Sequence, residues 1–147
     1  MTTIERSALV RFSARSMFKL VDDIEAYPEF LPWCSGSRVL QRSDDFVDAE
    51  LEIARGGFRK SFATRNKVSA SGEEIRMSLL NGPFSSLEGV WKFVPLREDA
   101  SKVCLKLDFE LASRLGGLAF GTMFSQICSS MVSAFSNRAK EIYGRKK

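Results

Sequence analysis

Hydrophobic and polar residues alternate along most of the first three quarters of the chain, in the period-two pattern of strands that bury one face. The alternating runs cover residues 4–12, 47–53, 58–68, 75–79, 87–93 and 103–111, with the run 75–79 continuing the run 58–68. Gly56-Gly57 and the sequence "NGPF" at residues 81–84 provide turns between strands. Strands this close along the chain predict a mostly antiparallel sheet with one face in water.

Helical spacing replaces the alternation in two places. Ser13 ends the first strand and is the expected N-cap of a short helix, whose apolar residues from Met17 to Ile24 run on until Pro28. The second place, residues 115–137, contains no charged residue and is long enough to raise the question of a transmembrane helix. The helical wheel favours an amphipathic helix instead, because a serine face opposes a single apolar arc. That arc holds Phe124, Ile127, Cys128, Met131, Val132, Phe135, Ala139 and Ile142.

These elements predict one α+β domain over residues 1–147. A curved antiparallel β-sheet wraps around a long C-terminal α-helix, and a short helical segment follows the first strand. Only the inner face of the sheet offers enough apolar surface to bury the helix. A gap stays between a curved sheet and a helix unless side chains fill it, and such a gap suits an apolar ligand.

The composition narrows the chemistry. The chain has 147 residues, 44% of them hydrophobic, and no histidine. Without imidazole, Ser-His catalysis, Cys-His catalysis and histidine-metal sites are excluded, so we predict a protein that is not an enzyme and holds no metal. Three cysteines without CxxC spacing, and a charged N-terminal segment unlike a secretion signal, predict a cytoplasmic protein. The net charge of +4 allows an acidic partner such as RNA or an anionic membrane without requiring one.

The sequence "YPEFLPWC" at residues 27–34 is hydrophobic for a segment that two prolines keep out of a regular helix. Its large apolar side chains are Tyr27, Phe30, Leu31 and Trp33. They either cap one end of the core or form the rim of a ligand pocket, and the pattern alone weighs the two equally. If they form a rim, the stiff proline loop is expected to face a flexible glycine-rich lip, "LGGLAFG" at residues 115–121.

The strand "FRKSFATRNK" at residues 58–67 combines an aromatic inner face with a basic outer face. Pairing about Gly56-Gly57 sets Arg65 beside Asp48, so we expect cross-strand salt bridges rather than a phosphate-binding stripe. The polar residues that alternate onto the inner face are Lys60, Thr64 and Asn66. They either line a hydrated part of the pocket and contact a ligand head group, or their side chains reach solvent at one end of the sheet.

Four segments of the chain resemble the coenzyme Q-binding START-like family of the polyketide cyclase/START superfamily, on its bacterial ribosome association toxin branch. They are "MFKLVDDIEAYPEFLPWCSGS" (17–37), "FATRN" (62–66), "NGPFSSLEGVWKF" (81–93) and "AFSNRAKEIY" (134–143). The resemblance spans nearly the whole chain in order. It implies a helix-grip (START-like) fold, a pocket for a hydrophobic ligand and no catalytic machinery.

The family divides in function, and the resemblance carries both branches. The first implied function is to bind ubiquinone or a similar polyprenyl lipid without a covalent bond and to support respiratory electron transport, with transient contact at the inner membrane. The alternative is binding to the large ribosomal subunit, which blocks subunit joining; a polyketide cyclase-like enzyme is a second alternative, disfavoured by the missing histidine. DNA is not an expected partner. The residues predicted to line the ligand pocket are Tyr27, Phe30, Leu31, Trp33, Phe62, Thr64, Leu79, Trp91, Phe93, Phe109, Phe120, Phe124 and Met131.

Overall fold

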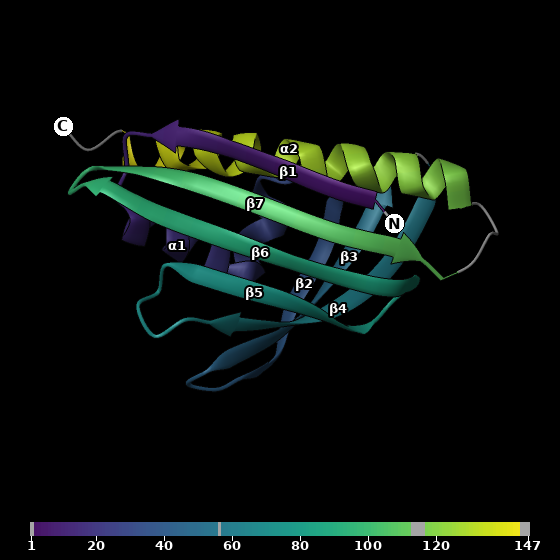
Figure 1. Ribbon diagram of the computed structural model, residues 1–147. Helices are drawn as coiled ribbons and strands as arrows, with labels where there is room; N and C mark the ends of the chain where they lie inside the picture. The colour runs from purple at the N-terminus through teal and green to yellow at the C-terminus, as the bar shows by residue number, and fades with distance from the viewer. Residues whose placement is uncertain (1, 56, 113–116, 145–147) are drawn as a thin grey trace.

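A computed structural model of the protein describes residues 2–55, 57–112 and 117–144. A seven-stranded antiparallel sheet curls around the long helix α2 (Gly117–Tyr143), and strand β1 (Thr2–Val10) runs beside that helix (Figure 1). The other elements, in chain order, are α1 (Ala14–Asp22), the 3₁₀ helix η1 (Ile24–Glu29), β2 (Cys34–Arg42), β3 (Phe46–Arg55), β4 (Phe58–Val68), β5 (Glu74–Asn81), β6 (Phe84–Arg97) and β7 (Ala100–Leu111). The predicted α+β helix-grip architecture is confirmed.

The strand order is β1-β7-β6-β5-β4-β3-β2, so β2 to β7 form a meander in which each strand pairs with its neighbour in sequence. The first strand closes one side of the sheet by pairing with the last, with Ile4 opposite Leu107. This arrangement leaves β1 and β2 as the two edges. The inner face of the curved sheet then surrounds α2, as the sequence pattern predicts (Figure 1).

The short helix begins where the sequence predicts and ends earlier. Ser13 caps α1, since its Oγ accepts a hydrogen bond of 3.0 Å from the Ser16 backbone N–H. The predicted continuation to Pro28 is wrong: Asp23 leaves the helical region (φ −86°, ψ 70°), and Pro28 lies inside the separate helix η1. A 3₁₀ helix of one or two turns tolerates proline because few of its N–H groups have internal partners.

Two strands differ from the pattern. The edge strand β2 is not marked by alternation, because it pairs only with β3 and most of its side chains are exposed. The run 75–79 does not continue β4; it belongs to β5, which turns back beside β4. Gly72, with φ of +74°, makes this turn possible, and the Ser69 Oγ accepts a hydrogen bond from the Glu74 N–H at 3.1 Å.

The outer face of β3 and β4 carries the predicted salt bridges. Arg65 lies opposite Asp48 in the sheet, and its Nε and Nη2 donate to the two carboxylate oxygens at 2.8 and 2.9 Å. These charge-assisted hydrogen bonds hold the pKa of Asp48 below its ordinary value. Of the predicted turn residues, Gly56 lies outside the described residues, and Gly57 has φ of +85°.

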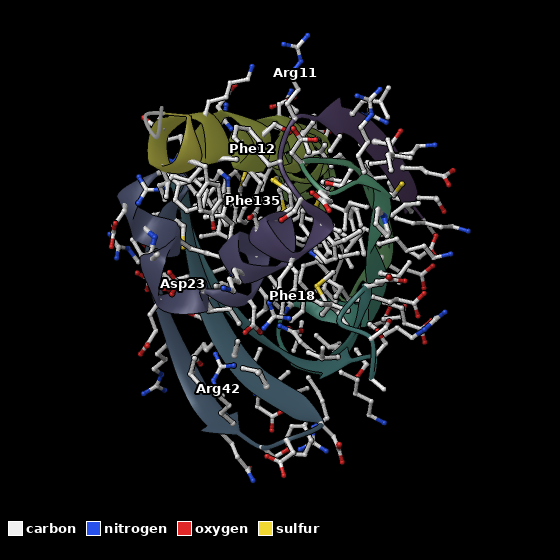
Figure 2. All side chains as sticks on the ribbon, turned by 90° about the vertical axis from the view of Figure 1, so that its left-hand side faces the viewer. Arg11, Phe12, Phe18, Asp23, Arg42 and Phe135 are labelled. Atoms are coloured by element: carbon white, nitrogen blue, oxygen red, sulfur yellow. The ribbon has the colours of Figure 1, made fainter. Side chains whose placement is uncertain are left out.

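Helix α2 buries the predicted apolar arc, apart from Met131, which is half-buried, and Ile142, which is 40% exposed near the helix end. Phe135, at the centre of the arc, is completely buried, and Figure 2 shows it inside the molecule while Arg11 projects outward. Among the residues that the structure describes, no helix combines the length and hydropathy needed to cross a bilayer.

Candidate functional site

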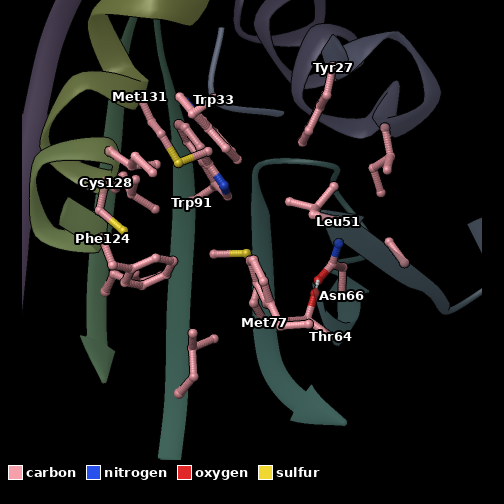
Figure 3. Close-up of a pocket in the computed structure, with 17 residues that line it drawn as sticks. Tyr27, Trp33, Leu51, Thr64, Asn66, Met77, Trp91, Phe124, Cys128 and Met131 are labelled. Atoms are coloured by element: carbon pink, nitrogen blue, oxygen red, sulfur yellow. Dashed lines mark hydrogen bonds between the residues drawn. The ribbon is translucent and has the colours of Figure 1, made fainter. Parts of the chain in front are cut away.

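A cavity of about 60 Å³ lies between the inner face of the sheet and α2 (Figure 3). Every strand from β3 to β7 contributes to its wall, together with α2, η1 and the loop that follows η1. The residues that line it are Ile24, Tyr27, Trp33, Ala49, Leu51, Phe62, Thr64, Asn66, Met77, Leu87, Trp91, Leu105, Leu107, Phe124, Ile127, Cys128 and Met131. None of them carries a charge, so the cavity is an apolar site with a few polar atoms.

Simple periodicity places these side chains. On β4 every second residue points inward, which brings Phe62, Thr64 and Asn66 to the same wall. On α2 the spacing of four and three residues aligns Phe124, Cys128 and Met131 along the face that looks into the sheet. The cavity is therefore built on rigid elements on two sides.

The polar atoms of the cavity lie on β4 and on two tryptophans. The Thr64 hydroxyl donates to the Asn66 Oδ1 at 2.8 Å (Figure 3). Among the described residues, the amide N–H₂ of Asn66 and the indole N–H groups of Trp33 and Trp91 form no hydrogen bond. The wall thus offers hydrogen-bond donors without protein acceptors, which a guest with acceptor oxygens could satisfy.

The titratable groups at the cavity are neutral at physiological pH. Burial, with smaller contributions from nearby acidic groups, raises the pKa of Tyr27 far above its ordinary value, and its hydroxyl donates to the Val21 carbonyl. Burial likewise raises the pKa of Cys128 to about 12. A thiol held in this protonated form is a poor nucleophile, so Cys128 serves as a small apolar wall residue.

Seven of the thirteen predicted pocket residues line the cavity. They are Tyr27, Trp33, Phe62, Thr64, Trp91, Phe124 and Met131. The structure places the other six elsewhere: Phe30, Leu31, Leu79, Phe93, Phe109 and Phe120. Three of these six, Leu79, Phe93 and Phe109, lie on strands, where inward alternation does not show which end of each strand meets the cavity.

The aromatic residues outside the cavity are held by their own packing. Phe93 stacks on Trp91 with ring centroids 6.2 Å apart and is covered by Phe18 of α1. Phe109 and Phe120 pack on the far side of Phe124, at centroid distances of 4.8 and 6.0 Å. These rings belong to the core beside the cavity and do not line it.

Sequence reasoning missed several lining residues, among them Leu51, Met77 and Leu107. Their inward alternation was visible, and only the strand register shows that they face the same space. Asn66 was recognised as an inward polar residue and does line the cavity. Lys60, predicted on the same inner face, is exposed, because it lies two residues from the start of β4 and its side chain reaches solvent.

The proline loop packs against the second half of α2. Phe30 contacts the Phe135 ring at 5.2 Å, and the Glu29 carboxylate accepts a hydrogen bond from Arg138 at 2.9 Å. Residues 115–116 of the predicted glycine-rich lip lie outside the described residues. Its last residue, Gly121, is fourteen helical residues from Phe135, about 21 Å along the axis. Phe30 therefore lies away from Gly121, because contacts of α1 and η1 with the C-terminal half of the helix fix this part of the loop there. The pairing of the whole loop with the lip stays a prediction.

The fold and the cavity define a class: an α+β helix-grip protein with an apolar, uncharged pocket between the sheet and the long helix. The chain matches the family described as polyketide cyclase / dehydrase and lipid transport over residues 10–136. The protein belongs to this family. The predicted resemblance to its coenzyme Q-binding START-like members, on the ribosome association toxin branch, is confirmed by the following relatives.

The Ribosome association toxin RatA of Vibrio cholerae is 49% identical to this chain over 144 residues, covering 98% of this chain and 99% of that protein. The mitochondrial Coenzyme Q-binding protein COQ10 homolog B of Xenopus laevis is 31% identical, covering 95% of this chain and 58% of that protein. A START superfamily protein from Mycobacterium smegmatis has the same fold, with a TM-score of 0.80 at 23% identity, covering 95% of this chain and 98% of that chain.

Proposed function

We propose that this protein associates with the ribosome in the cytoplasm, and that it acts by binding the large subunit and blocking subunit joining. The observation that supports this most directly is the 49% identity, across 98% of the chain, to a relative named for ribosome association. The relative named for coenzyme Q binding is more distant, at 31% identity. The order of the two functions expected from the sequence is therefore reversed.

The size of the cavity also favours ribosome association over quinone binding. A water molecule needs about 10–15 Å³, so 60 Å³ holds a few waters, whereas ligand pockets usually offer about 300–1,000 Å³. A polyprenyl chain would enter only after several side chains moved. Association with a large partner needs no such opening, because it uses the outer surface. Binding, not catalysis, is the activity that we propose.

Ribosome association is tested by sedimentation of purified protein with purified ribosomal subunits in a sucrose gradient. We expect the protein to move with the large subunit at low salt and to leave it steeply as salt rises, because phosphate contacts release counterions. Addition of the protein before subunit joining should lower the 70S peak. Protein that stays at the top of the gradient at low salt would contradict the proposal.

A second candidate function, binding of ubiquinone or another apolar molecule with acceptor oxygens, is favoured by the unused N–H donors of the cavity. Asn66, Trp33 and Trp91 present them to an otherwise apolar space. Met77 and Met131 line the same space, and the flexible methionine side chain can move aside at modest cost. The oxygens of a quinone ring could then accept hydrogen bonds from these N–H groups in place of water.

This candidate is tested by mass spectrometry of solvent extracts from the purified protein. We expect a quinone or lipid from the wild type and less of it from Asn66→Leu, which removes the donor and keeps the side-chain volume. Gln126→Leu makes the same amide-to-alkyl change on the exposed face of α2 and should leave loading unchanged. Equal loading of both variants would show that the Asn66 amide does not bind the ligand.

A further inference from the structure

Most arginines of β2 to β5 are paired, whereas the described cations of β6 and β7 are not. On β2 to β5, four arginines are neutralised by carboxylates of the same or the neighbouring strand, and among the described residues Arg55, Lys60 and Lys67 have no such partner. These pairs are Arg38–Glu50, Arg59–Glu52, Arg65–Asp48 and Arg76–Glu74, at 2.6 to 3.0 Å. On β6 and β7, none of the described cations has a described carboxylate within 4.0 Å. The unpaired cations there are Lys92, Arg97, Lys102 and Lys106.

Exposed aliphatic side chains gather beside these unpaired cations. Leu9 is 74% exposed and Leu96 is 55% exposed, at the end of β1 and near the β6–β7 turn. Lys102 of β7 lies between two of them in the sheet, since its register partners are Leu9 and the exposed Val94. Arg11 projects from the same end of the molecule (Figure 2). We name this region the basic end surface; it consists of Leu9, Arg11, Lys92, Leu96, Arg97 and Lys102.

We propose that the basic end surface is the part of the protein that docks on ribosomal RNA. The inference rests on the proposed ribosome association and adds the place and chemistry of the contact. Unpaired lysines and arginines suit phosphate oxygens, and no internal ion pair has to break before they bind. Two surface hollows of about 680 Å³ adjoin Leu9 and Arg11; Lys140 of α2 lines one, and Arg97 and Asp99 line the other.

The carboxylates of the β6–β7 turn disfavour insertion of this turn into a lipid surface, and because they repel phosphate as well, they leave the phosphate contacts to the strand cations. Glu98 and Asp99 are exposed at this turn, immediately after Leu96 and Arg97. Insertion of Leu96 into the acyl boundary of a membrane would bring both carboxylates out of water, which is costly for an unpaired charge. Contact with RNA leaves the turn solvated while the strand cations meet phosphates.

The test compares two double variants that each remove two exposed, unpaired cations. Lys92→Gln/Lys102→Gln changes the basic end surface, whereas Arg55→Gln/Lys60→Gln changes the β3–β4 hairpin. The hairpin lies at the opposite end of α2: Phe58 contacts Phe120 near the helix start, and Phe12 contacts Tyr143 at its end.

Binding to purified large subunits is measured between low and moderate salt. For Lys92→Gln/Lys102→Gln we expect at least about tenfold weaker binding and a slope of log K against log salt reduced by about 1.5, since each lost phosphate contact removes about 0.7–0.9. The hairpin variant should bind within about twofold of the wild type. Lys102→Arg should keep wild-type binding, because it keeps the charge, and melting temperatures confirm that each variant is folded.

Two results would overturn the inference, and only the second also overturns the proposed function. If the wild type binds subunits and Lys92→Gln/Lys102→Gln keeps its affinity and salt slope, the docking surface lies elsewhere and ribosome association stands. If the wild type does not bind subunits but binds phosphatidylglycerol vesicles through Lys92 and Lys102, the surface recognises lipid and both proposals fail.

Discussion

Phe135 of α2 contacts both the proline loop and the sheet, so it joins the three parts of the structure that enclose the cavity. Its truncation should be among the most destabilising single changes. Its ring is completely buried and meets Tyr27, Phe30 and Trp91 edge-on, at centroid distances of 5.4, 5.2 and 5.4 Å. Phe→Ala in a core costs about 3–5 kcal/mol, and each edge-to-face pair contributes about 0.5–1.5 kcal/mol beyond burial. We therefore expect Phe135→Ala to lower the free energy of unfolding by about 5 kcal/mol.

The assay is urea denaturation at pH 7, followed by tryptophan fluorescence, together with thermal melting. A loss of about 5 kcal/mol corresponds to a fall of roughly 10–20 °C in melting temperature for a chain of this size. Phe135→Leu keeps most of the volume and should cost about 1.5 kcal/mol, and Ile142→Ala, at a side chain 40% exposed on the same helix, under about 0.5 kcal/mol. If Phe135→Ala cost no more than Phe135→Leu, the proline loop would not be anchored to α2 through this ring.

Three further changes test the packing and the charges. Trp33→Ala should lower the free energy of unfolding by about 3–5 kcal/mol, since only 4% of Trp33 is exposed. A loss under about 1 kcal/mol in urea denaturation would instead favour a loop that forms the pocket rim and does not support the core. Asp48→Asn should destabilise the protein at pH 7 and hardly at pH 2. The lowered pKa of the Asp48 carboxyl stabilises the fold at pH values above the unfolded pKa near 3.9, and this stabilisation is lost as the pH falls through the folded pKa. Equal losses of unfolding free energy at the two pH values would refute this prediction. Gly89→Ala should cost about 1–3 kcal/mol by thermal melting, as its Cβ would lie 2.5 Å from Leu107 Cδ1 and 2.6 Å from Met77 Cε, and an unchanged melting temperature would show that both side chains move aside freely.

The proline loop, hydrophobic in sequence, resolves into two roles in the structure. Leu31 is buried in the core and Phe30 lies over Phe135, so these two close the end of the core. Tyr27 and Trp33 are equally buried but face the cavity. Phe30 and Leu31 therefore close the core, whereas Tyr27 and Trp33 line the cavity from within, and a rim role for the loop stays a prediction.

Local patterns predicted the elements, and long-range contacts decided the site. Period-two runs identified the inner faces of β3, β4, β6 and β7, and the pairing of Asp48 with Arg65 followed from counting residues back from the turn. The edge strand β2 was not predicted, because an edge strand that exposes most of its side chains need not alternate hydrophobic and polar residues. Which inward residues meet at the cavity depends on register between five strands and on where α2 crosses them, and neither is a property of any one segment.

The cavity and the basic end surface lie on opposite faces of the same strand, which makes the two proposed activities separable. Trp91 and Lys92 are consecutive on β6, and alternation sends the indole to the cavity and the ammonium group to the outer face. Changing Lys92 to Gln should thus weaken subunit binding and leave extracted lipid unchanged, whereas Asn66→Leu should do the reverse. If a bound ligand did alter ribosome affinity, the ribosome would have to alter ligand affinity by the same factor, and β6 is the element that could carry the coupling. Measuring both variants in both assays distinguishes independent sites from coupled ones, since coupling predicts that each variant changes both readouts.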